Sequence, residues 1–326
     1  MARNMKTTEA ERMLLNAKTA KQTKKALEAG ANVNVVCPLD GTTALILART
    51  AQQTKLLIKE GANVNAIDDK FCTALMYAKT AKQTRLLIEA GADVNAEEYC
   101  YTGHRPLMLA ETAEQTRLLI KAGANVNERD FNGYTALMYA KTAGQTRLLI
   151  KAGANVNERA PDGMTPLMSA KNAQQTKLLI DAGAYVKERY ERNNKGGLTA
   201  LMYATTAEQT RLLIKAGANV NQTDCWGHSV LEHAKTAEQA RLLIKAGAKG
   251  KISPFLLRME SEQRESLKKR LKTEIANNEK TKLSGVVVAN AIAKMKIDGK
   301  IQGDITPKMG EMIRAKIMAD IITRSK

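Results

Sequence analysis

The sequence predicts an all-α fold: a solenoid of about eight helical repeats followed by a small helical bundle. The main observation is a stretch, clearest at residues 141–157, that recurs with a period of 30 to 34 residues. Self-similarity at such a period is typical of a solenoid, in which each unit buries its apolar face only by stacking on the next. The glycines that close the eight copies are Gly30, Gly61, Gly91, Gly123, Gly153, Gly183, Gly217 and Gly247.

Each unit is predicted to contain a helix, a turn, a second helix and an extended finger. Residues 135–140 form a short helical run that Thr135 is suited to cap. Thr142 and Gln145 then make a capping box for a second helix, which Gly153 ends in a left-handed turn. Turn-forming residues at 155–157 and 162–163 predict the finger. The other boxes span residues 19–22, 50–53, 80–83, 112–115, 172–175, 206–209 and 236–239.

The two ends of the array differ from its middle. Residues 8–30 lack a preceding finger and place Lys24 and Lys25 at otherwise apolar positions, as a terminal cap would. Near residue 250 the repeat register ends, so we expect domains at 1–250 and 251–326. In the second, helices are expected from Ser253-Pro254, over 283–295, and from Thr306-Pro307 to about residue 323. No motif indicates the role of this bundle.

Two motifs carry a family resemblance. Residues 163–170, Gly-Met-Thr-Pro-Leu-Met-Ser-Ala, and residues 86–95 resemble the two halves of the ankyrin repeat. The resemblance covers residues 8 to 250 and implies protein binding through fingers and short first helices. The units are shorter than the family's usual length of about 33 residues, so the first helix should lose nearly one turn. The family's histidine is replaced by Ile46, Met76, Met108, Met138, Met168, Met202 and Glu232, so its finger hydrogen bonds must be lost or made otherwise.

Composition narrows the classes of function. The chain has 51 Lys and Arg residues against 33 Asp and Glu, a net charge of +18 that favours acidic partners. No apolar run is long enough to span a membrane, and no secretory signal follows Met1. Its four cysteines show no paired spacing and are expected to be reduced thiols. We therefore expect a cytoplasmic protein.

Basic side chains recur at fixed positions of the repeat. One row is Lys24, Lys55, Arg85, Arg117, Arg147, Lys177, Arg211 and Arg241. A second row, broken by Glu111 and Thr205, is Lys18, Arg49, Lys79, Lys141, Lys171 and Lys235. Stacked helices lie about 10 Å apart, so neighbouring charges repel by only about 0.4 kcal/mol in water. The rows are therefore either a solvated outer face or a surface for an acidic partner. The candidates are Arg49, Lys79, Lys141, Lys171, Arg117, Arg147 and Arg211.

Two fingers depart from the repeat period, and loops at the rim of an array are where partners are selected. The finger before Pro106 carries Tyr99, Tyr101, His104 and Arg105. The finger after Gly183 is longer and carries Tyr190, Arg192, Asn193 and Lys195. Tyrosine and arginine are enriched in binding hot spots, so we take these residues as candidate partner contacts. The alternative is that both are tolerated insertions. Trp226, on the last finger, is a further candidate or packs against the C-terminal helices.

The sequence contains no pattern for catalysis or for a cofactor. It has no glycine-rich phosphate loop and no cysteine with a plausible histidine base. Cys225-x-x-His228 followed by His233 resembles part of a zinc pattern, but a structural zinc needs four ligands and no fourth is near. We predict neither an enzyme nor a metal site.

The resulting hypothesis is an interaction scaffold whose concave side holds a protein partner, expected to be acidic. One alternative is nucleic-acid binding through the basic rows, although the sequence offers no aromatic platform for bases and no known reading motif. Another is an effector delivered into a host cell and acting on host proteins, a role in which ankyrin proteins are often found.

Overall fold

The structure is a computed structural model that describes residues 7–192 and 195–251, and it gives no side chains for residues 190–195. Its contacts divide the chain into two compact units, Met1–Gly227 and His228–Lys326. The helices expected from Ser253 onward lie outside the described residues, so the bundle and the boundary at residue 250 stay predictions. Within the described residues, no helix combines the length and the apolar character needed to cross a membrane.

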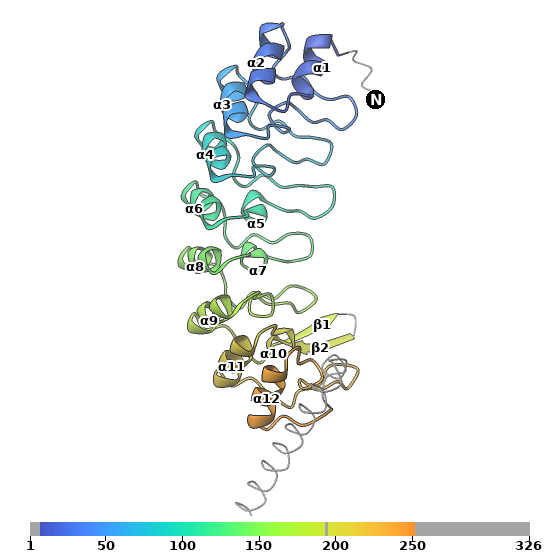
Figure 1. Cartoon of the computed structure of the whole chain (residues 1–326), viewed down its shortest axis with the longest axis vertical. Helices are drawn as coiled ribbons and strands as arrows, with labels where there is room; N and C mark the ends of the chain where they lie inside the picture. The colour runs from blue at the N-terminus through green and yellow to red at the C-terminus, as the bar shows by residue number, and fades with distance from the viewer. Residues whose placement is uncertain (1–6, 193–194, 252–326) are drawn as a thin grey trace, which may run out of the picture. The chain divides into compact units, whose positions relative to one another are not determined.

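The first unit is built around a column of stacked helices (Figure 1). A short helix, α1 (Glu9–Leu15), packs on α2 at the start of the column. Each column helix contacts the next, which confirms the repeat solenoid for this unit. The column consists of α2 (Ala20–Glu28), α3 (Ala51–Lys59), α4 (Ala81–Glu89), α6 (Ala113–Lys121), α8 (Ala143–Lys151), α9 (Ala173–Asp181) and α11 (Ala207–Lys215). The second unit contains α12 (Ala237–Lys245).

The predicted limits of the column helices are confirmed. In α8 the Thr142 hydroxyl accepts from the amide of Gln145, and the Gln145 side chain accepts from the amide of Thr142. Every column helix begins with an equivalent threonine, or with Asn172 in α9, whose side chain accepts from the amide of the glutamine three residues later. Gly153 follows α8 with a φ of 87°, in the left-handed region where glycine carries no penalty.

The first helices are shorter than expected. α5 (Pro106–Leu109), α7 (Ala136–Tyr139) and α10 (Ala200–Tyr203) have four residues each, and the corresponding segments at 43–48, 73–78 and 165–170 form only turns. The prediction that Thr135 caps its helix with its side chain is wrong. Its hydroxyl is buried and accepts no capping bond. A single turn followed at once by extended backbone at Ala140 leaves little helix to cap.

A ladder of buried glutamines joins each repeat to the one before it. The Gln145 amide donates to the Ala110 carbonyl at 2.8 Å and to the Thr116 hydroxyl at 3.2 Å. Its oxygen accepts from the amide of Lys141, in its own repeat. Because a buried polar group must be paired, this geometry fixes how neighbouring units stack. The same inter-repeat bonds are made by Gln53, Gln83, Gln115, Gln175 and Gln209.

A second ladder runs over the turns that follow the column helices. The Asn127 amide donates to the Gly153 carbonyl at 3.1 Å, and its oxygen accepts from the amide of Asn155 at 2.8 Å. Each rung therefore ties two backbone groups of the next repeat. Lys187 holds this position in the sixth unit and interrupts the ladder. The other rungs are Asn34, Asn65, Asn95 and Asn157.

The long finger after Gly183 is a β-hairpin rather than an irregular loop. Its strands are β1 (Arg189–Arg192) and β2 (Lys195–Thr199), which pair antiparallel with an irregularity between Tyr190 and Glu191. Shorter fingers close with isolated bridges such as Val36 to Thr43. The fingers extend from the first unit on the side away from the helix column (Figure 1).

Candidate interaction surface on the fingers

A buried carboxylate holds each of two fingers to the segment that follows it, α7 in one unit and the turns at 73–78 in the other. Asp130 accepts from the amides of Asn132 and Tyr134, both at 2.9 Å, and from the Tyr139 hydroxyl at 2.6 Å. Asp68 makes the equivalent bond to Tyr77 at 2.9 Å. Burial and then the acceptor Asp130 raise the pKa of Tyr139, so it stays a neutral donor. These bonds fasten the fingers in units that lack the family's usual histidine.

Glu98 has the equivalent position in the fourth unit, where the finger is longer, and it binds groups of the finger itself. It is 6% exposed and accepts from the Thr102 hydroxyl and from the amides of Tyr101, Thr102 and Gly103. Burial alone would raise the pKa of Glu98, but these donors outweigh it, so its pKa lies below the ordinary value. The irregular finger is therefore well ordered at its base.

The structure separates the four candidates on this finger into base and tip. The His104 Nε2 atom lies 3.1 Å from the Tyr139 hydroxyl and 3.4 Å from an Asp130 oxygen. The Arg105 side chain is only 16% exposed and contacts Glu97, at 3.1 Å, and Glu128. Both residues thus lie at the base of the finger and contact the next unit, His104 through Tyr139 and Arg105 through Glu128.

The other two candidates lie at the tip of the finger. Tyr99 is 61% exposed and Tyr101 is 74% exposed. Phe71, from the preceding finger, meets the Tyr99 ring edge to face, with ring centroids 5.9 Å apart. The two fingers are therefore joined through aromatic rings at an exposed position.

Phe71 has an unusual backbone conformation. Its φ is 63°, and it is the one non-glycine residue with positive φ among the residues that the structure describes. A bulky residue pays roughly 1–2 kcal/mol for this left-handed region, and strain of this kind concentrates at functional sites. At the same finger position the other units have glycine, with φ from 71° to 85°: Gly41, Gly103, Gly133, Gly163, Gly197 and Gly227.

Exposed apolar side chains follow consecutive finger tips. We call this set the fingertip patch, and it comprises Leu39, Phe71, Tyr99, Tyr101 and Phe131, exposed by 91%, 44%, 61%, 74% and 54%. The tips also touch through the backbone. The amide of Asp69 donates to the Asp40 carbonyl at 3.0 Å, and that of Phe131 donates to the Thr102 carbonyl at 2.9 Å. The patch is therefore one continuous edge spanning four fingers.

Three members of the patch, Leu39, Phe71 and Phe131, were not among the residues predicted from sequence. A signal for Phe71 was available, because aligning the repeats shows a phenylalanine where the other units have glycine. Leu39 lies in a finger only one residue longer than the regular ones and Phe131 in a finger of regular length, so a search for unusual loops passes over both.

The remaining finger candidates are only partly described. The backbone of Tyr190, Arg192 and Lys195 lies in the hairpin, without side chains, and Asn193 lies outside the described residues. Trp226 is 62% exposed, and its amide donates to Asp224 at 2.9 Å. Their role as partner contacts stays a prediction.

The candidate basic side chains are exposed, and some have acidic partners. Arg117 contacts Glu114 at 2.6 Å, and Arg85 reaches the same carboxylate at 3.3 Å. Lys141 lies 4.0 Å from Glu111, and Arg211 contacts Glu208. For the others, Arg49, Lys79, Arg147 and Lys171, the structure gives no ion pair within the described residues.

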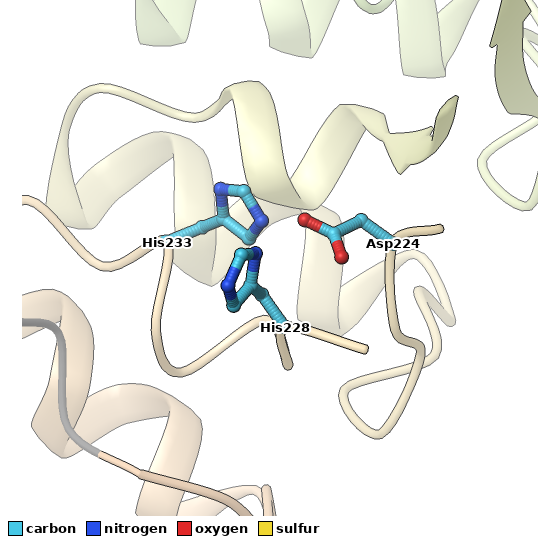
Figure 2. A group of neighbouring side chains, drawn as sticks. All are labelled: Asp224, His228 and His233. Carbon is cyan, nitrogen blue, oxygen red and sulfur yellow. The ribbon is translucent and has the colours of Figure 1, made fainter. Parts of the chain in front are cut away.

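The histidines of the partial zinc pattern occupy positions that tyrosines hold in another unit. The rings of His228 and His233 lie edge to face, with centroids 6.3 Å apart (Figure 2). By repeat position they replace Tyr134 and Tyr139, and Asp224 replaces Asp130. The eighth unit therefore has the residue types of a finger fastening at these positions, and we assign no metal site to it.

A family model matches the repeat region of the chain. The family model described as "Ankyrin repeats (3 copies)" matches residues 13–98, 49–130, 83–160, 107–190 and 143–224. These overlapping matches cover more than half of the chain. A search of curated proteins found no match.

Proposed function

Because the chain belongs to the ankyrin-repeat family, whose repeats are generally protein–protein interaction modules, we propose that it is a scaffold that binds a protein partner through the fingertip patch. The observation that carries this proposal is Phe71. It is a strained, half-exposed aromatic residue at a position where the other fingers have glycine.

The Phe71 ring leaves apolar surface in solvent. Its left-handed backbone costs roughly 1–2 kcal/mol, and the edge-to-face pair with Tyr99 returns about 0.5–1.5 kcal/mol. The ring is still 44% exposed in the fold, so a large part of its apolar surface is free to be buried against a partner.

The rest of the patch has the composition of an interface core. Tyrosine and phenylalanine are enriched where partners are fully desolvated. The base of the longest finger in the patch is held by the Glu98 hydrogen bonds and by the ion pairs of Arg105. A surface that is already ordered loses less entropy on binding.

The patch itself gives no preference for an acidic partner. Asp40 and Asp69 are exposed beside it, with Lys70 as a nearby cation. Its chemistry fits an apolar surface on the partner. We also infer a cytoplasmic location, because all four cysteines are free thiols. Neither nucleic-acid binding nor delivery into a host cell is favoured by a contact described above.

The test compares four forms of the full chain in its native cells: wild type, Phe71→Gly, Tyr99→Ala and Tyr185→Ala. Tyr185 is 63% exposed on a turn after α9 and serves as the matched control. After crosslinking, the proposal expects the same protein to be lost from the Phe71 and Tyr99 variants and kept by the control. That protein is then purified, and its affinity is expected to fall at least about tenfold for each patch variant.

The result against the proposal is equally direct. If the triple variant Phe71→Gly/Tyr99→Ala/Tyr101→Ala keeps every crosslinked protein of the wild type, the fingertip patch is not the binding site.

A further inference from the structure

The outer face of the helix column has a basic region whose charge the fold balances only in part. Its centre is α8, which has no acidic residue in Ala143–Lys151. We define the outer basic strip as Arg117, Lys121, Arg147 and Lys151, on the exposed sides of α6 and α8. We propose that this strip is a second docking surface, which binds an acidic, amphipathic segment of a partner protein.

The α8 half of the strip lacks the acidic partner that α6 has. On α6, Glu114 contacts both Arg117 and Arg85, and these contacts, first with Arg117, lower the pKa of Glu114. The equivalent position on α8 is Gly144, which has no side chain. Among the described residues, Arg147 therefore has no carboxylate partner, and its guanidinium is available to one from outside.

The spaces between column helices add an apolar component. A cavity of about 430 Å³ lies between α4 and α6, with half-buried Ile88 and Leu118 in its lining. Arg85, Arg117, Lys121 and one acid, Glu89, complete most of its wall.

Aligning the repeats shows which residues take the same positions between the next pair of helices. Between α6 and α8 the half-buried apolar residues are Ile120 and Leu148, and the position of Glu89 is taken by Lys121. The strip thus presents cations beside apolar side chains, and Glu114, paired with Arg117, is the one carboxylate that forms an ion pair with it among the described residues. A segment that alternates carboxylates with apolar side chains complements it on both counts.

The same features disfavour nucleic acid as the occupant. Apolar side chains offer nothing to phosphates, and α6 and α8 carry no aromatic residue on which bases could stack. The strip also lies on the helix column, away from the fingers (Figure 1). This inference therefore does not rest on the fingertip patch, and the two surfaces can be tested separately.

The experiment measures fluorescence anisotropy of three labelled probes with the full chain. The probes are a synthetic helical peptide with leucine on one face and glutamate on the other, polyglutamate of equal length, and a short DNA duplex. We expect the amphipathic peptide to bind most tightly. Its affinity should fall at least about tenfold in Arg147→Glu/Lys151→Glu, because two attractive charges become repulsive.

Two controls make the result specific. Lys70→Glu/Lys187→Glu has the same change of net charge on exposed residues of a finger and a turn, and it should change the affinity by less than about twofold. Phe71→Gly should leave it unchanged. Equal losses of affinity in both double variants would show that the effect comes from net charge alone, against the proposal. Polyglutamate binding as tightly as the amphipathic peptide, or DNA binding more tightly than either peptide, would also overturn the proposal.

Discussion

The interior of the helix column repeats the same residues from unit to unit, whereas the tips of the fingers do not. In the interior, the same glutamine makes the same two inter-repeat bonds in six successive units, and it is at most 3% exposed. At the tips, the residues differ from finger to finger, and one of them is strained. The comparison indicates that stacking constrains the interior, whereas the tips are free to vary and to serve recognition.

The largest effect is expected from breaking the interior. Gln145→Leu leaves the Ala110 carbonyl and the Lys141 amide without their partner in a buried region, so the free energy of unfolding should fall by about 2–3 kcal/mol. Denaturant unfolding monitored by circular dichroism measures it. Gln174→Leu, an exposed glutamine on the next helix, is the control and should stay within about 0.5 kcal/mol of wild type. Equal losses would show that the ladder is not what stabilises the stack.

The base of a finger should behave like the interior, with a dependence on pH. Glu98→Gln is expected to lower the free energy of unfolding by about 1–2 kcal/mol at neutral pH, because charge-assisted bonds from Thr102 and nearby amides weaken. The pKa of Glu98 is lowered in the folded state, so its contribution is present above its ordinary value of 4.5 and is lost as pH falls below it.

Unfolding free energies of wild type and Glu98→Gln, measured across acidic pH, should therefore converge as the pH decreases. A constant difference down to the lowest pH would contradict the assignment.

The tips should give a smaller effect whose sign depends on the position. Phe71→Gly removes the strain, but it also removes the ring contact with Tyr99 and adds chain entropy, so stability should stay within about 0.5 kcal/mol of wild type. Gly103→Ala is the reciprocal change. Its new Cβ would lie 2.5 Å from the Phe131 ring at a φ of 71°, so it should cost at least about 1 kcal/mol. Thermal unfolding of both variants checks the pair. A large loss for Phe71→Gly would make Phe71 a structural residue.

The smallest effect is expected where the asparagine ladder stops. Lys187→Asn should restore a rung to the Gly217 carbonyl and the Asn219 amide, adding about 0.5–1 kcal/mol. Lys187→Ala controls for the loss of the lysine. Hydrogen exchange should show slower opening of the turn at residues 217–219 in the asparagine variant alone. If both variants exchange alike, the ladder does not extend to this joint.

Much of the fold follows from local sequence, and the exceptions have physical reasons. Thr142, Gln145 and Gly153 act within one helix, so their roles as cap and terminator could be predicted from spacing. The bond from Gln145 to Ala110 spans 35 residues and depends on how units stack. Local sequence therefore predicts the capping bonds of Gln145 but not its bond to the preceding repeat.

The candidate site was predictable only in part. Tyr99 and Tyr101 were found because their finger breaks the period. Arg105 has the residue type of a hot spot, but the structure surrounds it with Glu97 and Glu128. Phe71 could be recognised as unusual by aligning the repeats, but its strain became evident only once a backbone conformation was assigned to its position.

The glutamine bonds also bear on how this chain can change in evolution. The glutamine of each unit supplies the donor to the unit before it, and an alanine carbonyl and a threonine hydroxyl of the same unit accept from the glutamine of the next. Duplicating or deleting one complete unit therefore preserves every such bond. Extra residues in a finger also preserve them, because Gln115 and Gln209 make the same bonds across the two longest fingers. The number of units can thus drift by gene duplication at little cost in stability, and length can change within a unit where the finger lies.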